Sequence, residues 1–237
     1  MSNEVVVINE ESLALTDNVI NLQIKKPELK LMIKGQVLIN ELFDNSNINQ
    51  KLTIELAPQA HLLYNYLALS QNAKRQIIIN QTDSSQLTFN YAYLTKTPME
   101  LELVINIYGN HNYNQINING VNIASGQTTI TVTGTIAGQT KGNQVSENIS
   151  CLTLNNAPHI IRPNLIVKAG DCEVSHNATI SPLDPNEKFY LASKGLAPAV
   201  INKLLIKGFL SKKLSLDQTL INQVKERLET ELSSDES

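Results

Sequence analysis

The chain has 237 residues, of which 42% are hydrophobic, and its formal net charge is −3. This length supports one sizeable core with a small appended element, and the composition excludes an intrinsically disordered chain. The 19 Lys and Arg residues are balanced by 22 Asp and Glu residues, which excludes a strongly basic surface for nucleic acid or anionic membranes.

The sequence carries no recognisable targeting signal. Its first eight residues, MSNEVVVI, contain neither the basic region nor the apolar region of a secretory signal peptide. No segment approaches the roughly 20 apolar residues that span a bilayer. The two cysteines, Cys151 and Cys172, do not suggest a disulfide framework. We therefore predict a cytoplasmic protein that binds neither membranes nor nucleic acid.

From about residue 5 to residue 183, apolar and polar residues alternate with a period of two, which is typical of half-buried β-strands. Leu29, Leu31 and Ile33 form one such apolar set. Similar alternation occurs in residues 87–93, 101–108, 116–123 and 129–136. Residues 56–70 fit the period of a strand and that of a helix equally well.

The predicted strands recur about every ten to twelve residues and are separated by Asn, Gly, Ser or Asp. Gly134, Gly138 and Gly142 are interpreted as turns between strands. Many short strands at even spacing indicate a β-sandwich, a β-barrel or a β-solenoid. No strict repeat is visible, so the pattern leaves these alternatives open.

After the predicted strands the pattern changes to helices. The first helix is predicted to have Asp184 as its N-cap, Pro185 at its first position and Gly195 after its last turn. The second is predicted to begin at Pro198 and to end at Gly208.

A third helix is the clearest of the three. Ser215 and Gln218 are predicted to begin it, and apolar residues then recur at every fourth position: Leu216, Leu220, Val224, Leu228 and Leu232. Residues 233–237 are expected to fray. The pattern therefore divides the chain into a strand-rich region, residues 1–183, and a helical segment, residues 184–237.

Several motifs follow one another near the C-terminus: PNLIVKAGDCEVSHNAT (163–179), LD (183–184), FYLASKG (189–195) and GF (208–209). In this order they resemble the C-terminal signature of the SufB/SufD family, the scaffold subunits of the SUF iron–sulfur cluster assembly system. The resemblance covers roughly residues 144–210 and is closer to SufD than to SufB. Upstream, only the strand-rich character fits the family.

This resemblance implies a fold. Among the three alternatives it selects the β-solenoid, as a right-handed parallel β-helix with a small helical segment at its C-terminal end. Asn and Thr residues at strand ends suit that fold, because they can stack as hydrogen-bonded ladders between successive turns.

His176 matches the family histidine proposed to take part in building a cluster. Neutral imidazole is a good ligand for iron, and Asp171 or Glu173 is close enough in sequence to fix its tautomer. The alternative role of His176 is a hydrogen bond at a strand end that serves subunit packing. Cys172 is a weaker candidate ligand, which shares a strand face with His176 if the strand is unbroken. Both cysteines are also typical of small core residues.

The chain departs from the family pattern at four positions. Val174 stands where the family places a cysteine in this segment, and Ala157 lies near the position of a thiol implicated in SufB. Asn177 replaces the usual Gly, which we interpret as a turn with a left-handed backbone. Lys194 replaces the usual Arg, so the bidentate pairing of a guanidinium is lost there.

The resemblance implies a non-catalytic scaffold that pairs with a SufB-like paralogue or with itself and binds the SUF ATPase. The sequence contains no nucleotide-binding motif, so ATPase activity is assigned to the partner. Lys194, Gly208 and Phe209 are the candidate partner-binding residues, with Phe209 predicted in a loop after the second helix. No cofactor is expected to be stably bound, because a stable cluster usually takes four thiolates, but a transient iron–sulfur cluster is compatible with the implied role.

Two other functions fit a strand-rich chain. One is a β-solenoid interaction protein with no role in cluster assembly. The other is a carbohydrate-active β-helix enzyme, which needs carboxylates that converge on one groove. The predicted strands contain few Asp residues, and the chain has no Trp for stacking on sugars.

Overall fold

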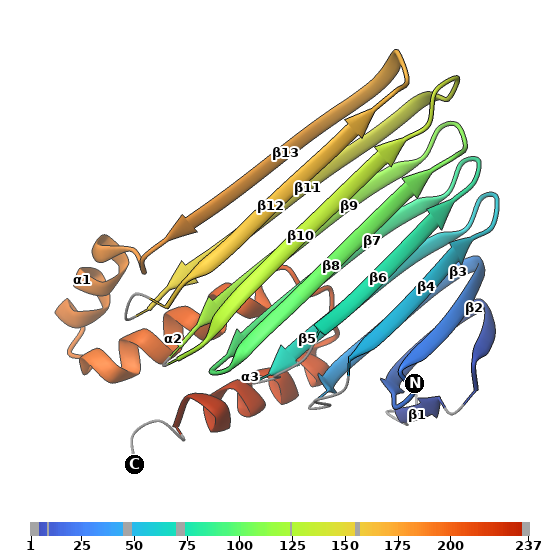
Figure 1. The fold of residues 1–237 in the computed structure, drawn as a ribbon. Coiled ribbons are helices and arrows are strands. Elements are labelled where there is room, and N and C mark those ends of the chain that lie inside the picture. Colours follow the sequence, from blue (N-terminus) through green and yellow to red (C-terminus); the bar gives the residue numbers. More distant parts are fainter. Residues whose placement is uncertain are drawn as a thin grey trace.

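The structure is a computed structural model that describes residues 5–8, 10–44, 49–69, 74–123, 125–154 and 157–233. They form a parallel β-solenoid of about five turns, followed by helices (Figure 1). The strands are β1 (Val5–Ile8), β2 (Ser12–Ile24), β3 (Glu28–Asp44), β4 (Gln50–Leu56), β5 (His61–Leu69), β6 (Lys74–Gln81), β7 (Gln86–Thr95), β8 (Pro98–Ile107), β9 (Tyr113–Asn122), β10 (Gln127–Ile136), β11 (Lys141–Thr153), β12 (His159–Val167) and β13 (Asp171–Ser181). The helices are α1 (Pro185–Ser193), α2 (Pro198–Ser211) and α3 (Gln218–Ser233).

Two parallel sheets form the walls of the solenoid. The even sheet contains β4, β6, β8, β10 and β12, and the odd sheet contains β5, β7, β9, β11 and β13. The long strand β3 belongs to both, because its first half pairs with β4 and its second half pairs with β5. Gly35, with a φ of +67°, lies between the two halves, where the chain turns from one wall to the other. The prediction of a β-solenoid is confirmed.

The alternation in the sequence places one side-chain set between the two walls. On β8, for example, Leu101, Leu103 and Ile105 are buried inside the solenoid, whereas the residues between them lie on the outer face. Aromatic rings contribute to the same core, as Tyr64 stacks on Phe89 with their centroids 5.4 Å apart. Residues 61–69, which fit two periods, form the strand β5.

An asparagine ladder runs along the outer face of the odd sheet. The side-chain amide of each member donates to the side-chain oxygen of the preceding one: Asn40 to Asn21, Asn65 to Asn40, Asn90 to Asn65 and Asn117 to Asn90. These bonds hold neighbouring strands in register. The predicted stacking of asparagines is confirmed, although these residues lie within strands and not at their ends.

Helices α2 and α3 cover part of the outer face of the odd sheet. Their apolar residues form a second core with the strand residues beneath them: Ile206, Leu210, Val224 and Leu228 against Leu67, Leu69, Leu94 and Val121. Helix α1 contacts α2 and buries none of its own residues. It lies beside the end of β13 and projects from the solenoid (Figure 1).

The predicted start of the first helix is confirmed, since the side chain of Asp184 accepts a hydrogen bond from the Asn186 amide. The second helix does not end at Gly208 but continues to Ser211. A glycine inside a helix costs about 1 kcal/mol relative to alanine, whereas full burial of a leucine such as Leu210 stabilises by about 1.5–3 kcal/mol. The stabilisation from burying Leu210 therefore outweighs the cost of having Gly208 inside the helix.

Two other local predictions are wrong. Asp217, and not Ser215, caps the third helix, as its carboxylate accepts from the Leu220 amide at 2.9 Å. Ser215 is engaged elsewhere, because its backbone exchanges two hydrogen bonds with the side chain of Asn65. Gly134 lies inside β10 and Gly142 inside β11, so neither is a turn, whereas Gly138 does lie in the turn between these two strands. The predicted fraying concerns mostly residues 234–237, which lie outside the described part of the chain.

Candidate functional site

The motif that carries the resemblance forms the end of the solenoid. Its longest part, residues 163–179, lies on β12 and β13, which together make the last rung, and the shorter motifs after it lie on or beside α1 and α2. β12 pairs with β10, and β13 pairs with β11, but no strand of the described chain pairs with their other edges. The backbone N–H and C=O groups along both edges are therefore available for a partner.

The last rung also leaves the interior of the solenoid open. Val174 is in register with the buried Val145, and Ile180 with the buried Cys151, so both side chains point toward the interior. Val174 is nevertheless 40% exposed and Ile180 49% exposed. No further rung covers them in the described residues, so the core ends at an apolar surface.

His176 lies on the same inward-facing row of β13 and is exposed. Neither of the carboxylates expected to orient it lies beside it, because Glu173 belongs to the opposite face of the strand and Asp171 begins the strand. The residue in register with His176 is Glu147 on β11. The structure thus places a different carboxylate next to the imidazole.

Glu147 is buried, with 1% of its surface exposed, and neither carboxylate oxygen has a hydrogen-bond partner in the described residues. Burial raises the pKa of Glu147 to about 7. Gly134 on the opposite wall leaves the room it needs, since a Cβ atom there would lie 3.0 Å from Oε1 of Glu147. Nothing in the sequence around His176 points to Glu147, which lies one rung earlier.

The cysteines do not join His176. Cys172 shares its strand face, as predicted, but four residues of extended strand separate them by about 13 Å. Cys172 is partly buried against the core, and its thiol donates to the carbonyl of Ala169 at 3.7 Å. Across the described residues, no group of three or more His, Cys, Asp or Glu side chains could hold a metal ion.

Cys151 lies inside the solenoid in a hydrogen-bonded group. Its sulfur is 3.2 Å from the hydroxyl of Tyr93, which is 3.0 Å from Nδ1 of His159. Burial raises the pKa of the Cys151 thiol to about 11, so it is protonated at neutral pH. Cys151 is buried in the apolar core between the two walls, so it is the small core residue that was expected.

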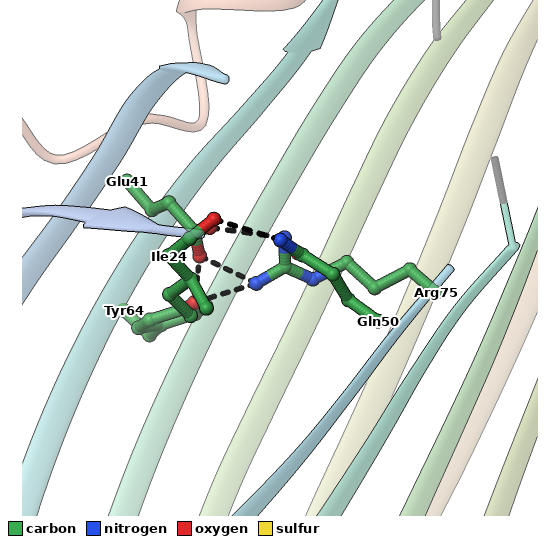
Figure 2. Close-up of polar contacts among 5 residues, drawn as sticks. All are labelled: Ile24, Glu41, Gln50, Tyr64 and Arg75. Carbon is green, nitrogen blue, oxygen red and sulfur yellow. Dashed lines mark hydrogen bonds and ion pairs between the residues drawn. The ribbon is translucent and has the colours of Figure 1, made fainter. Parts of the chain in front are cut away.

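A second buried carboxylate, that of Glu41, lies on the early strand β3, and Figure 2 shows the polar contacts around it. Arg75 donates two hydrogen bonds to Glu41, at 2.9 and 2.6 Å, and the hydroxyl of Tyr64 donates to the same carboxylate. Gln50 accepts from Arg75 at 2.8 Å and donates to the carbonyl of Ile24. This network joins five strands, and each charge in it has an opposite charge beside it.

Of the candidate partner-binding residues, Gly208 and Phe209 lie on α2, and Lys194 is the C-cap of α1. Phe209 is in the last turn of α2 and not in a loop, and it is partly buried against the second core. Gly208 and Lys194 are exposed. On α1, Phe189 is 77% exposed and Tyr190 is also exposed, although the sequence offered no sign of which aromatic residues would face solvent.

Asn177 lies inside β13, in register with Asn148, and does not have a positive φ. The interpretation of this position as a left-handed turn is wrong, because the strand continues through it to Ser181. None of the described helices is long and apolar enough to cross a membrane.

Comparison with protein families decides the assignment. The model described as SUF system FeS cluster assembly, SufBD core domain, matches residues 40–209. The chain belongs to this SufBD core-domain family. The match begins far upstream of the C-terminal motifs, so the strands from β3 onward are part of the family domain. The chain therefore has a role in SUF iron–sulfur cluster assembly, as part of a family whose members are non-catalytic components of the SUF complex. No curated protein matches the sequence.

Proposed function

We propose that this chain is a scaffold subunit on which an iron–sulfur cluster is assembled in the cytoplasm. The observation that supports this most is the open last rung, which carries His176 on its inward face together with exposed apolar side chains. Such a surface can join a second SufB/SufD-type chain and leave an imidazole at the junction. Iron and sulfide are the substrates of this site, and ATP hydrolysis belongs to a partner.

The pairing chain is a SufB-like paralogue or a second copy of this one, and the SUF ATPase binds through the C-terminal helices. The helices suit this role because α2 and α3 are fixed to the odd sheet, while α1 presents exposed aromatic rings. A movement of the ATPase can therefore be transmitted to the solenoid. The isolated chain holds no stable cluster, since its two cysteines do not share a site.

The test of this function is complementation of a SUF-dependent strain with His176→Ala. We expect activity of cluster-dependent enzymes to fall strongly, because the variant lacks the exposed imidazole at the last rung. The melting temperature should change little, since the side chain of His176 is exposed. Normal activity of these enzymes in the variant strain would contradict the proposed role. Val19→Ala, an exposed position on β2, is the matched control.

A further inference from the structure

The two buried glutamates of the described chain differ in what balances their charge. Glu41 is held by the guanidinium of Arg75 and by the Tyr64 hydroxyl. Glu147 has no hydrogen-bond partner on either oxygen in the same set of residues. A buried carboxylate without a partner is costly, so a cation from outside the chain would stabilise it.

Only one side of Glu147 has a neighbour that could help to bind such a cation. Ile116 lies beside it on β9, and Gly134 and Leu165 lie across from it on the even sheet. None of these three carries charge. The remaining neighbour is His176 on β13, whose Cα atom lies one strand spacing away, or about 4.8 Å. Because the two residues are in register on parallel strands, their side chains point the same way.

An ion can reach this pair from solvent. His176 is exposed, and the inward row of β13 is covered by no further rung of the described chain. The neighbouring Val174 and Ala178 are exposed as well. The carboxylate oxygens of Glu147 are themselves buried, so the ion enters past these exposed side chains.

We propose that Glu147 and His176 together bind one divalent first-row transition-metal ion at the open end of the solenoid. One carboxylate oxygen and one imidazole nitrogen suit Fe²⁺, Mn²⁺, Co²⁺ or Zn²⁺, and two protein ligands leave the other positions open. An ion held in this way is exchangeable. This inference rests on the proposed function, in which the ion is the iron supplied for assembly, and it identifies Glu147 as the second ligand.

Titration of the full chain with Co²⁺ tests the site, with visible absorption and calorimetry as readouts. We expect one Co²⁺ per chain, and affinity at least about tenfold lower, equivalent to ~1.4 kcal/mol, for Glu147→Gln and for His176→Ala. Glu173→Gln is the matched control, because that carboxylate is close in sequence but lies on the other strand face. Its affinity should equal that of the wild type.

Glu147→Gln keeps the shape of the side chain, so loss of folding is not expected, and circular dichroism checks this. Bound Co²⁺ should also raise the melting temperature of the wild type but not of Glu147→Gln. Wild-type affinity in Glu147→Gln, or no Co²⁺ binding by the wild type, would overturn the inference. If His176→Ala fails in complementation while Glu147→Gln binds Co²⁺ normally, the proposed function stands and this site does not. If the site binds Co²⁺ but both variants support cluster assembly, the site stands and the proposed function fails.

Discussion

At the scale of single residues, the position of a buried glutamate within the solenoid determines how its burial affects the stability of the fold. Glu41 lies among early rungs, where neighbouring strands bring an arginine and a tyrosine hydroxyl to it. Glu147 lies under the last rung, opposite a glycine, and burial raises its pKa to about 7. The first arrangement balances the buried charge within the fold, whereas the second gives up stability at the open end of the solenoid.

The raised pKa of Glu147 predicts how stability depends on pH. Between its ordinary pKa of about 4.5 and the folded-state pKa of about 7, the folded chain holds a proton that the unfolded chain has released. The free energy of unfolding should therefore fall as pH rises through this range and level off above it, by at most ~3 kcal/mol. Urea unfolding with a chelator present, at pH 5 and pH 8, measures this change.

Glu147→Gln supplies the comparison, because it removes the titrating group and retains His176, the titratable neighbour. We expect the variant to be more stable than the wild type at pH 8, with a smaller difference at pH 5. Identical pH dependence in the two proteins would show that Glu147 does not titrate in this range.

At the scale of elements, the period of two predicted the strands well because each wall of the solenoid has one buried face. The side-by-side placement of Glu147 and His176 could not be predicted, since it depends on the length of each turn. His61 pairs with Gln86, 25 residues later, whereas Tyr113 pairs with Gln144, 31 residues later. Without a constant repeat, no spacing in the sequence assigns residues to one row.

The helix ends also could not all be predicted from the sequence. Gly208 and Ser215 have the local chemistry of a helix end and a helix start, and both predictions were wrong. Contacts with the distant odd sheet decided the outcome, through the burial of Leu210 and the pairing of Ser215 with Asn65. Asp184 was predicted correctly because its cap is made within four residues of chain.

Helix α2 is where we expect the ATPase to bind. The Phe209 ring is only partly buried, and the ammonium of Lys212 lies 5.3 Å from its centroid. Phe209→Ala should weaken binding of the SUF ATPase subunit at least tenfold, equivalent to ~1.4 kcal/mol, because interface aromatics often anchor such contacts. Calorimetric titration measures the affinity, and circular dichroism should show that the solenoid stays folded.

Leu210→Ala is the control for this experiment, because Leu210 is fully buried in the second core. It should lower the melting temperature more than Phe209→Ala and should affect affinity less. If the two variants lose stability and affinity in the same proportion, Phe209 is core packing and the ATPase docks elsewhere.

At the scale of the whole molecule, the two ends of the solenoid are not equivalent. At the start of the solenoid, β1 pairs along β2, whereas the last rung has free edges on both walls in the described chain. Association would cover the free edges and the exposed core end, and a two-fold axis would let two last rungs cover each other. The same contact would bring the His176 side chain of one chain toward the partner.

This geometry predicts that association depends on the apolar side chains of the last rung. Val174→Lys places a charge on the inward row of β13 and should shift the chain to monomer, alone and in mixtures with a SufB-like paralogue. Val19→Lys, on the exposed face of β2, should leave association unchanged, because that strand lies near the other end of the solenoid. Sedimentation velocity over a range of concentrations distinguishes the cases. A wild-type chain that stays monomeric both alone and with the paralogue would show that the last rung is not an interface. If Val174→Lys and Val19→Lys weaken association equally, the added charge and not the last-rung surface is responsible.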